Sequence, residues 1–125
     1  MVRFYTTTTL LALLATFTAA NPITKRDRPR TTPNTQGCGA VQHNRLLWYT
    51  VYVGVTYANG NGCAYIGDQL KDRFGQDEFG DYRCTEDDFG DTLLKFACIW
   101  GRGQEINEVL HRMYPMVNGF NCPSS

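Results

Sequence analysis

The feature that most constrains the fold is a change of hydrophobic period at Cys63. From Trp48 to Tyr57 the residues alternate, with Tyr49, Val51, Val53, Val55 and Tyr57 on one side and Trp48, Thr50, Tyr52, Gly54 and Thr56 on the other. Alternation of β-branched and aromatic residues predicts a strand over 47–57, with the first set facing a core. From Cys63 onward, Cys63, Ile66, Leu70 and Phe74 recur at three- and four-residue steps, which predicts an amphipathic helix ending before Gly75.

Three further strands and a second helix are expected along the rest of the chain. The strands cover 81–85, 92–100 and 117–122, and the helix carries Ile106, Val109, Leu110 and Met113 before Pro115. The resulting order, β-α-β-β-α-β, predicts an α+β two-layer sandwich of the ferredoxin-like, split βαβ type. Its four-stranded antiparallel sheet has the order 4-1-3-2, with both helices on one face and no helix on the other.

The first 26 residues have the composition of segments that are removed during secretion. Residues 1–20, with one Arg and an apolar run ending at Ala20, are typical of a signal peptide, and the run is too short for a membrane anchor. Residues 21–26 end in the pair Lys25 and Arg26, which predicts a propeptide cut there, with a charged linker as the alternative. We therefore expect a secreted, extracellular protein with a flexible arm at 27–37 and one folded domain at 38–125.

The expected mature chain has a net negative charge, although the formal net charge of the whole sequence is zero. Three of the 12 basic residues, Arg3, Lys25 and Arg26, lie in the expected removed part, so nine remain against 12 acidic residues. Nucleic-acid binding needs a dense basic surface. The balance therefore argues against nucleic acid as the partner.

The five cysteines predict a disulfide framework. They contain no CxxC pair and no adjacent histidine cluster, so we expect no metal and no cofactor. Cys38 before the first strand and Cys122 in the last strand would meet at one end of the sheet, which predicts the first disulfide. Cys63 could bond Cys84 or Cys98, and we favour Cys84. Cys98 is then a buried free thiol, with a bond to another chain as the alternative.

The segment 77–91 is strongly acidic, with seven carboxylates in 15 residues. They are Asp77, Glu78, Asp81, Glu86, Asp87, Asp88 and Asp91. Calcium binding is one interpretation, but the spacing of an EF-hand loop is absent. We interpret the segment as a solvated turn whose charge could steer a basic partner.

The uncovered face of the predicted sheet carries apolar and aromatic side chains. If Leu94, Phe96, Cys98 and Trp100 face the helices, the alternate residues of strand 92–100 face outward beside the first strand. Such a patch is typical of an interaction site. The predicted protein-binding residues are Trp48, Thr50, Tyr52, Leu93, Lys95 and Ile99. The alternative is that the preceding arm, with Val41, Leu46 and Leu47, folds over this face.

Three segments resemble small secreted effectors of plant-pathogenic fungi that share the fold of a virally encoded smut-fungus killer toxin. They are WYTVYVGVTYANGNGC with its following helix, RGQEINEVLHRMYP and VNGFNCP, and they span most of Trp48 to Pro123. The resemblance implies a non-enzymatic virulence or avirulence protein. Some members are helper effectors that act as a pair with a second secreted effector. The implied partner is such an effector or a host protein, in the plant apoplast or host cell.

Two other functions fit parts of the sequence. A killer-toxin-like protein would act on the membranes of competing cells. A secreted ribonuclease would need general acid and base groups, for which the helix at 106–113 and its start offer Glu105, Glu108, His111 and Arg112. These four lie on one exposed helix, and Glu108 and Arg112 have the spacing of an ordinary i,i+4 ion pair. We therefore expect no catalytic site.

Overall fold

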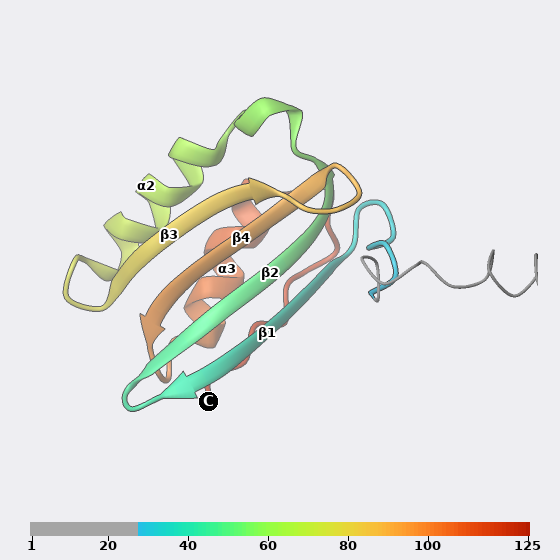
Figure 1. Cartoon of the computed structure of the whole chain (residues 1–125). Helices are drawn as coiled ribbons and strands as arrows, with labels where there is room; N and C mark the ends of the chain where they lie inside the picture. The colour runs from blue at the N-terminus through green and yellow to red at the C-terminus, as the bar shows by residue number, and fades with distance from the viewer. Residues whose placement is uncertain (1–27) are drawn as a thin grey trace, which may run out of the picture.

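A computed structural model describes residues 28–125, and these residues form two layers (Figure 1). The elements are β1 Gln36–His43, β2 Leu46–Thr56, the 3₁₀ turn η1 Ala58–Gly60, α2 Cys63–Phe74, β3 Phe79–Glu86, β4 Asp91–Ile99 and α3 Gly103–Met113. The sheet is antiparallel throughout and has the order β1-β2-β4-β3. The expected signal peptide 1–20 and propeptide 21–26, with Ala20, Lys25 and Arg26, lie outside the described residues.

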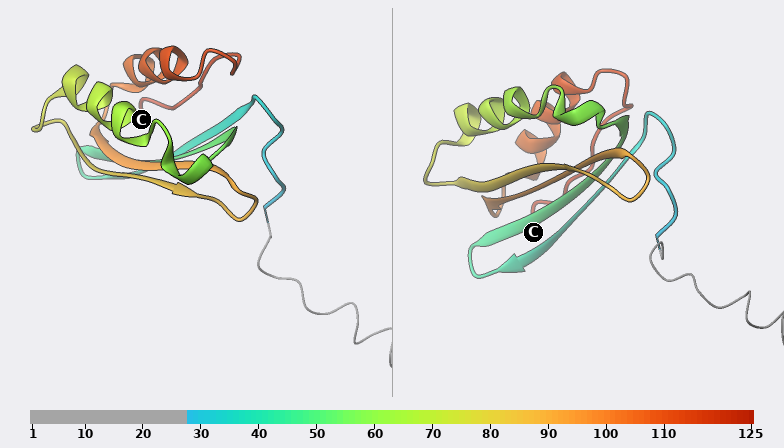
Figure 2. Two further views of the ribbon diagram at one scale, coloured as in Figure 1. Left: turned by 90° about the horizontal axis from the view of Figure 1, so that it is seen from above. Right: turned by 45° about the horizontal axis from the view of Figure 1, so that its top comes forward.

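Five of the six predicted elements are confirmed, with their ends within two residues of the expected positions except at the start of α3. They are β2, α2, β3, β4 and α3, and the central pair β2 and β4 lies where the split βαβ pattern puts it. Helix α2 ends at Phe74 because Gly75 takes a left-handed φ of 78°, which favours glycine. Both helices pack on one side of the sheet, and no helix of residues 28–125 covers the other side, here called the outer face (Figure 2).

The predicted order was wrong at one edge of the sheet. Instead of residues 117–122, the edge strand beside β2 is β1, so the order is ββαββα. Only Asn44 and Arg45 separate β1 from β2, and Asn44 accepts the left-handed φ of 61° that the tight turn needs. A hairpin this short closes at little entropic cost. In 117–122, by contrast, Gly119 has a φ of 86°, which interrupts an extended strand.

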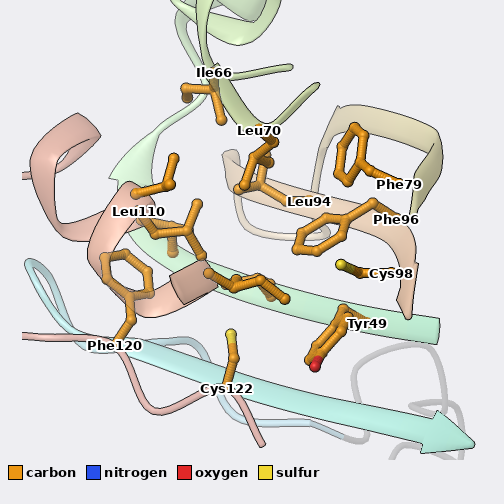
Figure 3. Packing of buried hydrophobic residues seen from close by; sticks show 14 of the residues in the cluster. Tyr49, Ile66, Leu70, Phe79, Leu94, Phe96, Cys98, Leu110, Phe120 and Cys122 are labelled. Atoms are coloured by element: carbon orange, nitrogen blue, oxygen red, sulfur yellow. The ribbon is translucent and has the colours of Figure 1, made fainter. Parts of the chain in front are cut away.

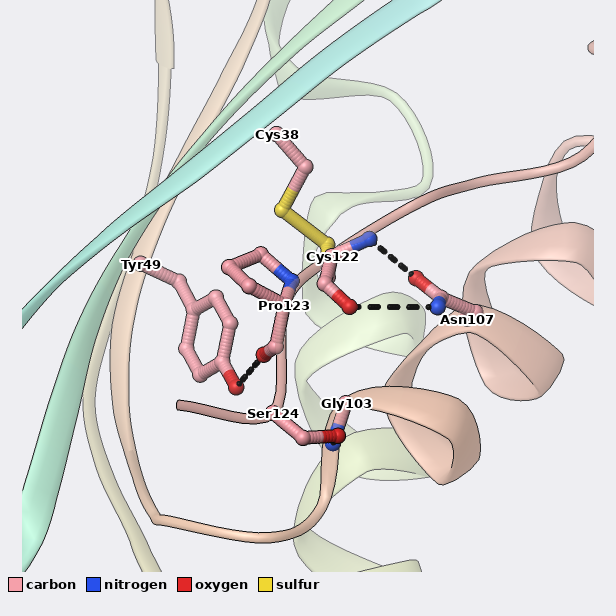
Figure 4. The surroundings of a disulfide bond; sticks show 7 residues. All are labelled: Cys38, Tyr49, Gly103, Asn107, Cys122, Pro123 and Ser124. Atoms are coloured by element: carbon pink, nitrogen blue, oxygen red, sulfur yellow. Dashed lines mark hydrogen bonds between the residues drawn. A yellow bond between two sulfur atoms is a disulfide. The ribbon is translucent and has the colours of Figure 1, made fainter.

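The C-terminal tail, residues 114–125, packs against the helix-covered side of the sheet instead of joining it as a strand. Val117, Phe120 and Cys122 are buried in the core. Asn107 of α3 accepts a hydrogen bond from the Cys122 N–H at 2.7 Å and donates one to the Cys122 carbonyl oxygen at 3.3 Å (Figure 4). The tail also lies so close to Gly103 that a Cβ there would be 2.6 Å from the Cys122 oxygen, so α3 begins at a residue without a side chain.

The core lies between the sheet and the two helices, as the alternation predicts. Tyr49, Val51 and Val53 of β2 and Leu94, Phe96 and Cys98 of β4 are buried against Ile66, Leu70, Ile106, Val109 and Leu110 (Figure 3). The rings of Tyr49 and Phe96 stack with centroids 5.2 Å apart. Trp100 was predicted to join the core with Leu94, Phe96 and Cys98, but it is 53% exposed. It follows Ile99, the last residue of β4, where the sheet ends and fewer side chains can cover it.

The disulfides are Cys38–Cys122 and Cys63–Cys84, and Cys98 is buried and unbonded. These are the pairings expected from the sequence. The reason for the first differs, because Cys38 lies within β1 and Cys122 lies in the tail, not in a neighbouring strand. The expected flexible arm, 27–37, accordingly contains the first two residues of β1.

Tyr49 is expected to make stability depend on alkaline pH. Burial raises its pKa to about 12, and its hydroxyl donates a hydrogen bond to the Pro123 oxygen at 2.5 Å. A folded-state pKa above the unfolded value of about 10 means that this stabilisation is complete below about pH 10 and is lost as pH rises through about 12. Between about pH 8 and pH 11, the ionisation of Tyr49 alone should lower the free energy of unfolding by about 1 kcal/mol.

Urea unfolding followed by circular dichroism over that pH range tests the prediction. A Cys98→Ala background removes the free thiol, whose own pKa burial raises to about 11 and whose thiolate could exchange disulfides. In that background the Tyr49→Phe variant should lose less stability with rising pH than the parent. Parallel pH curves would contradict the assignment.

Candidate protein-binding surface

The sheet brings all six residues predicted to bind a protein onto its outer face. In the antiparallel register of β2 with β4, Thr50 lies opposite Lys95, Tyr52 opposite Leu93, and Leu46 opposite Ile99. Trp48 lies opposite Ala97, with Val41 of β1 on its other side. The shared face therefore follows from the alternation and from the pairing of β2 with β4. That these residues bind a protein stays a prediction.

The Tyr52 end of this face is covered by residues 28–35, here called the N-terminal segment. The guanidinium carbon of Arg28 lies 3.7 Å from the centroid of the Tyr52 ring, and Arg28 also forms an ion pair with Asp87 at 3.2 Å. The segment is held by further contacts: the N–H of Asn34 donates to the Gly54 oxygen, and the N–H of Gly54 donates to the Thr35 oxygen, both at 2.8 Å. Residues 28–35 are therefore anchored to the edge of the sheet rather than free.

The cover does not come from the residues that the sequence suggested. Leu47 is buried in the core on the helix side, Leu46 is a half-buried residue of β2, and Val41 is an edge-strand residue that is 71% exposed. Arg28 was missed because a single arginine in a polar, proline-containing stretch gives no pattern. Its contact with Tyr52 depends on how β1 pairs with β2 and on the path of the chain before β1, which only the tertiary structure decides.

The Trp48 end of the face is open and contains a groove of about 340 Å³. Trp48, Thr50, Asp81, Arg83 and Lys95 line it on the outer face, and Trp48 is 41% exposed. The groove lies where the register of β3 against β4 shifts between Gly80 and Arg83. Asp81 at this irregularity has a left-handed φ of 53°. Arg83 was not among the predicted binding residues, although alternation with the inward Tyr82 and Cys84 would have placed it on the outer face.

The acidic segment is only partly the solvated turn that we expected. Asp91 is 4% exposed and accepts two hydrogen bonds from the Arg30 guanidinium, at 3.0 and 3.2 Å. Asp87 accepts hydrogen bonds from the N–H groups of Phe89 and Asp91 as well as from Arg28. These carboxylates close the β3–β4 turn and fasten the N-terminal segment to it. Among residues 28–125, no three His, Cys, Asp or Glu side chains are grouped so that they could hold a metal ion.

The four residues considered for a ribonuclease lie on α3, away from the groove. Glu105 pairs with Arg102 at 3.0 Å. Glu108 contacts Arg73 of α2 at 3.9 Å, a cation on the neighbouring helix that the i,i+4 spacing along α3 could not reveal. His111 and Arg112 are exposed.

The chain is thus a small disulfide-bonded α+β protein with a four-stranded antiparallel sheet. No family model, curated protein or solved structure matches it. Within the part of the chain that the structure describes, neither helix is both long and apolar enough to cross a membrane. The two disulfides are consistent with an extracellular location, because such bonds persist in oxidising compartments.

Proposed function

We propose that this protein is secreted and acts by binding another protein at the Trp48 end of its outer sheet face. The observation that carries the proposal is the exposure of Trp48 beside a groove on the face opposite both helices. Tryptophan is enriched among the residues that dominate binding energy in protein interfaces. An exposed indole that joins other apolar side chains is a poor surface for a protein that binds nothing.

The anchoring of Arg28 on Tyr52 narrows the proposed surface. Tyr52 and Leu93 form its margin, because the N-terminal segment already contacts the Tyr52 ring. The centre then consists of Trp48, Thr50 and Lys95, with Ile99 further along β4. This arrangement places the aromatic Trp48 beside the polar Thr50 and Lys95, so a partner would make both apolar contacts and hydrogen bonds there, as protein interfaces usually do.

The resemblance to effectors of plant-pathogenic fungi supports a particular biological role for this binding. It favours a virulence or avirulence effector that acts in the plant host, with a second secreted effector or a host protein as partner. The acidic balance of the expected mature chain argues against nucleic acid as that partner. A protein that acts by binding needs no catalytic group, so the role is compatible with the ion pairs of Glu105 and Glu108 on α3.

The Trp48→Glu variant is expected to fold normally and to bind its partner about 30-fold more weakly, because a central interface tryptophan contributes about 2 kcal/mol or more. The tagged protein, the variant and an Arg112→Glu control should be expressed in the producing fungus during plant infection. Cross-linking, purification and mass spectrometry would then compare the proteins recovered. Arg112 is exposed on α3, on the helix side of the sheet, so its variant should recover the same partner as the parent.

Recovery of one partner equally by all three proteins would refute binding at the outer face. Degradation of RNA by the purified parent, lost on His111 substitution, would favour the ribonuclease. Leakage of lipid vesicles exposed to the parent would favour a membrane-active toxin.

A further inference from the structure

We infer that the groove beside Trp48 binds an acidic segment of a partner protein, with Arg83 and Lys95 holding one of its carboxylates. This inference rests on the proposed binding at the outer face and specifies the chemistry of the partner. Arg83 of β3 and Lys95 of β4 lie directly opposite each other in the sheet register. Both are exposed, and both line the same groove as Trp48.

The two cations differ from most other basic side chains of the described chain because they have no acidic partner. Arg28, Arg30, Arg73 and Arg102 each form an ion pair with a carboxylate. Neither Arg83 nor Lys95 forms a salt bridge or a side-chain hydrogen bond within residues 28–125. Like charges placed directly opposite in a sheet destabilise it. A pair that lowers stability without a compensating contact is explained if its counter-charge comes from another molecule.

The remaining groove residues favour a peptide segment over a small inorganic anion. Asp81 lies at the same groove and can only accept hydrogen bonds when ionised, so it repels any anion but can accept a hydrogen bond from a peptide N–H, a group that phosphate lacks. Trp48 offers an apolar surface next to the cations, which suits the side chain that adjoins a carboxylate in a peptide. A polyanion such as nucleic acid is disfavoured because acidic residues outnumber basic ones in the expected mature chain.

The inference is tested by titrating the isotope-labelled secreted protein with a short synthetic peptide of alternating Glu and Leu, followed by NMR. The matched peptide with Gln in place of Glu and inorganic phosphate serve as comparison probes. The indole signal of Trp48 should shift with the Glu peptide, and that of Trp100 should not. The Arg83→Gln/Lys95→Gln variant should bind the Glu peptide at least about tenfold more weakly, and salt at about 0.5 M should abolish the difference.

A Lys71→Gln/Arg112→Gln variant is the matched control, because it removes two exposed cations from the helices. It should bind the Glu peptide as the parent does. Equal binding of the Gln peptide, tighter binding of phosphate, undiminished binding by Arg83→Gln/Lys95→Gln, or no shift with the Glu peptide at millimolar concentration would each overturn the inference. If Trp48→Glu loses the natural partner while Arg83→Gln/Lys95→Gln keeps it, the proposed function stands and only this inference fails.

Discussion

Replacing both Cys38 and Cys122 with alanine is expected to lower the free energy of unfolding by about 4 kcal/mol, because this disulfide closes the longer loop of the two. The bonded cysteines are 84 residues apart. The bond joins edge strand β1 to the C-terminal tail, which the sheet does not otherwise hold by strand pairing. Loss of this disulfide therefore raises the conformational entropy of the unfolded chain. It also removes a bond that holds the tail in the native protein. Both cysteines must change together, since one alone would leave a thiol able to attack the second disulfide.

Chemical denaturation followed by circular dichroism would measure this loss. The matched control is the Cys63→Ala/Cys84→Ala variant. It lacks the disulfide whose cysteines are 21 residues apart, and its free energy of unfolding should fall by about 3 kcal/mol. Asn107→Ala in the Cys38→Ala/Cys122→Ala background would then report on what still holds the tail, through its two hydrogen bonds to Cys122. If the long-range disulfide contributed less than the shorter one, the tail would not depend on it as we describe.

The Phe96→Ala substitution is expected to cost about 4 kcal/mol of stability, because it empties the centre of the core. Phe96 is 1% exposed and packs on Tyr49 and Phe79, with ring centroids at 5.2 and 5.5 Å. Rings from three strands thus meet at this position, and their neighbours cannot all move to fill the space. A loss of this size would leave the domain near the limit of stable folding.

Lys95 is the matched control for Phe96, since it is the preceding residue of β4 and faces the opposite side of the sheet. Lys95→Ala should change the free energy of unfolding by about 0.5 kcal/mol or less, as expected of an exposed side chain. Thermal or denaturant unfolding of the two variants compares the faces directly. A small effect at Phe96 together with a large one at Lys95 would mean that the two faces of the sheet are reversed.

The two faces of β2 and β4 could be read from the sequence because alternation is a local property. A strand that alternates tyrosine and valine with polar residues can bury only one side, so Tyr49, Val51 and Val53 had to face a core. The same pattern put Trp48, Thr50 and Lys95 on the outer face. Helices α2 and α3 were equally predictable, because the three- and four-residue spacing of their apolar residues and the helix-ending residues that follow are local features of the sequence.

The edge of the sheet and the contacts between charged residues on its outer face were not predictable in this way. Strand β1 carries Gly37 and Gly39, which weaken the strand signal, and it forms because the adjacent turn places it beside β2. The placement of Arg28 over Tyr52 depends on contacts with Asp87, which is distant in sequence. The opposition of Arg83 and Lys95 depends on the register of β3 with β4.

The sequence by itself therefore determined the class of this protein, its core residues and the composition of its outer face. It did so because periodicity, turn residues and burial act within one element at a time. The tertiary structure alone decided which segment completes the sheet, which end of the outer face stays open and which charges meet there. These depend on pairings between residues far apart in the chain, whose free energies compete with one another and leave no mark on local sequence.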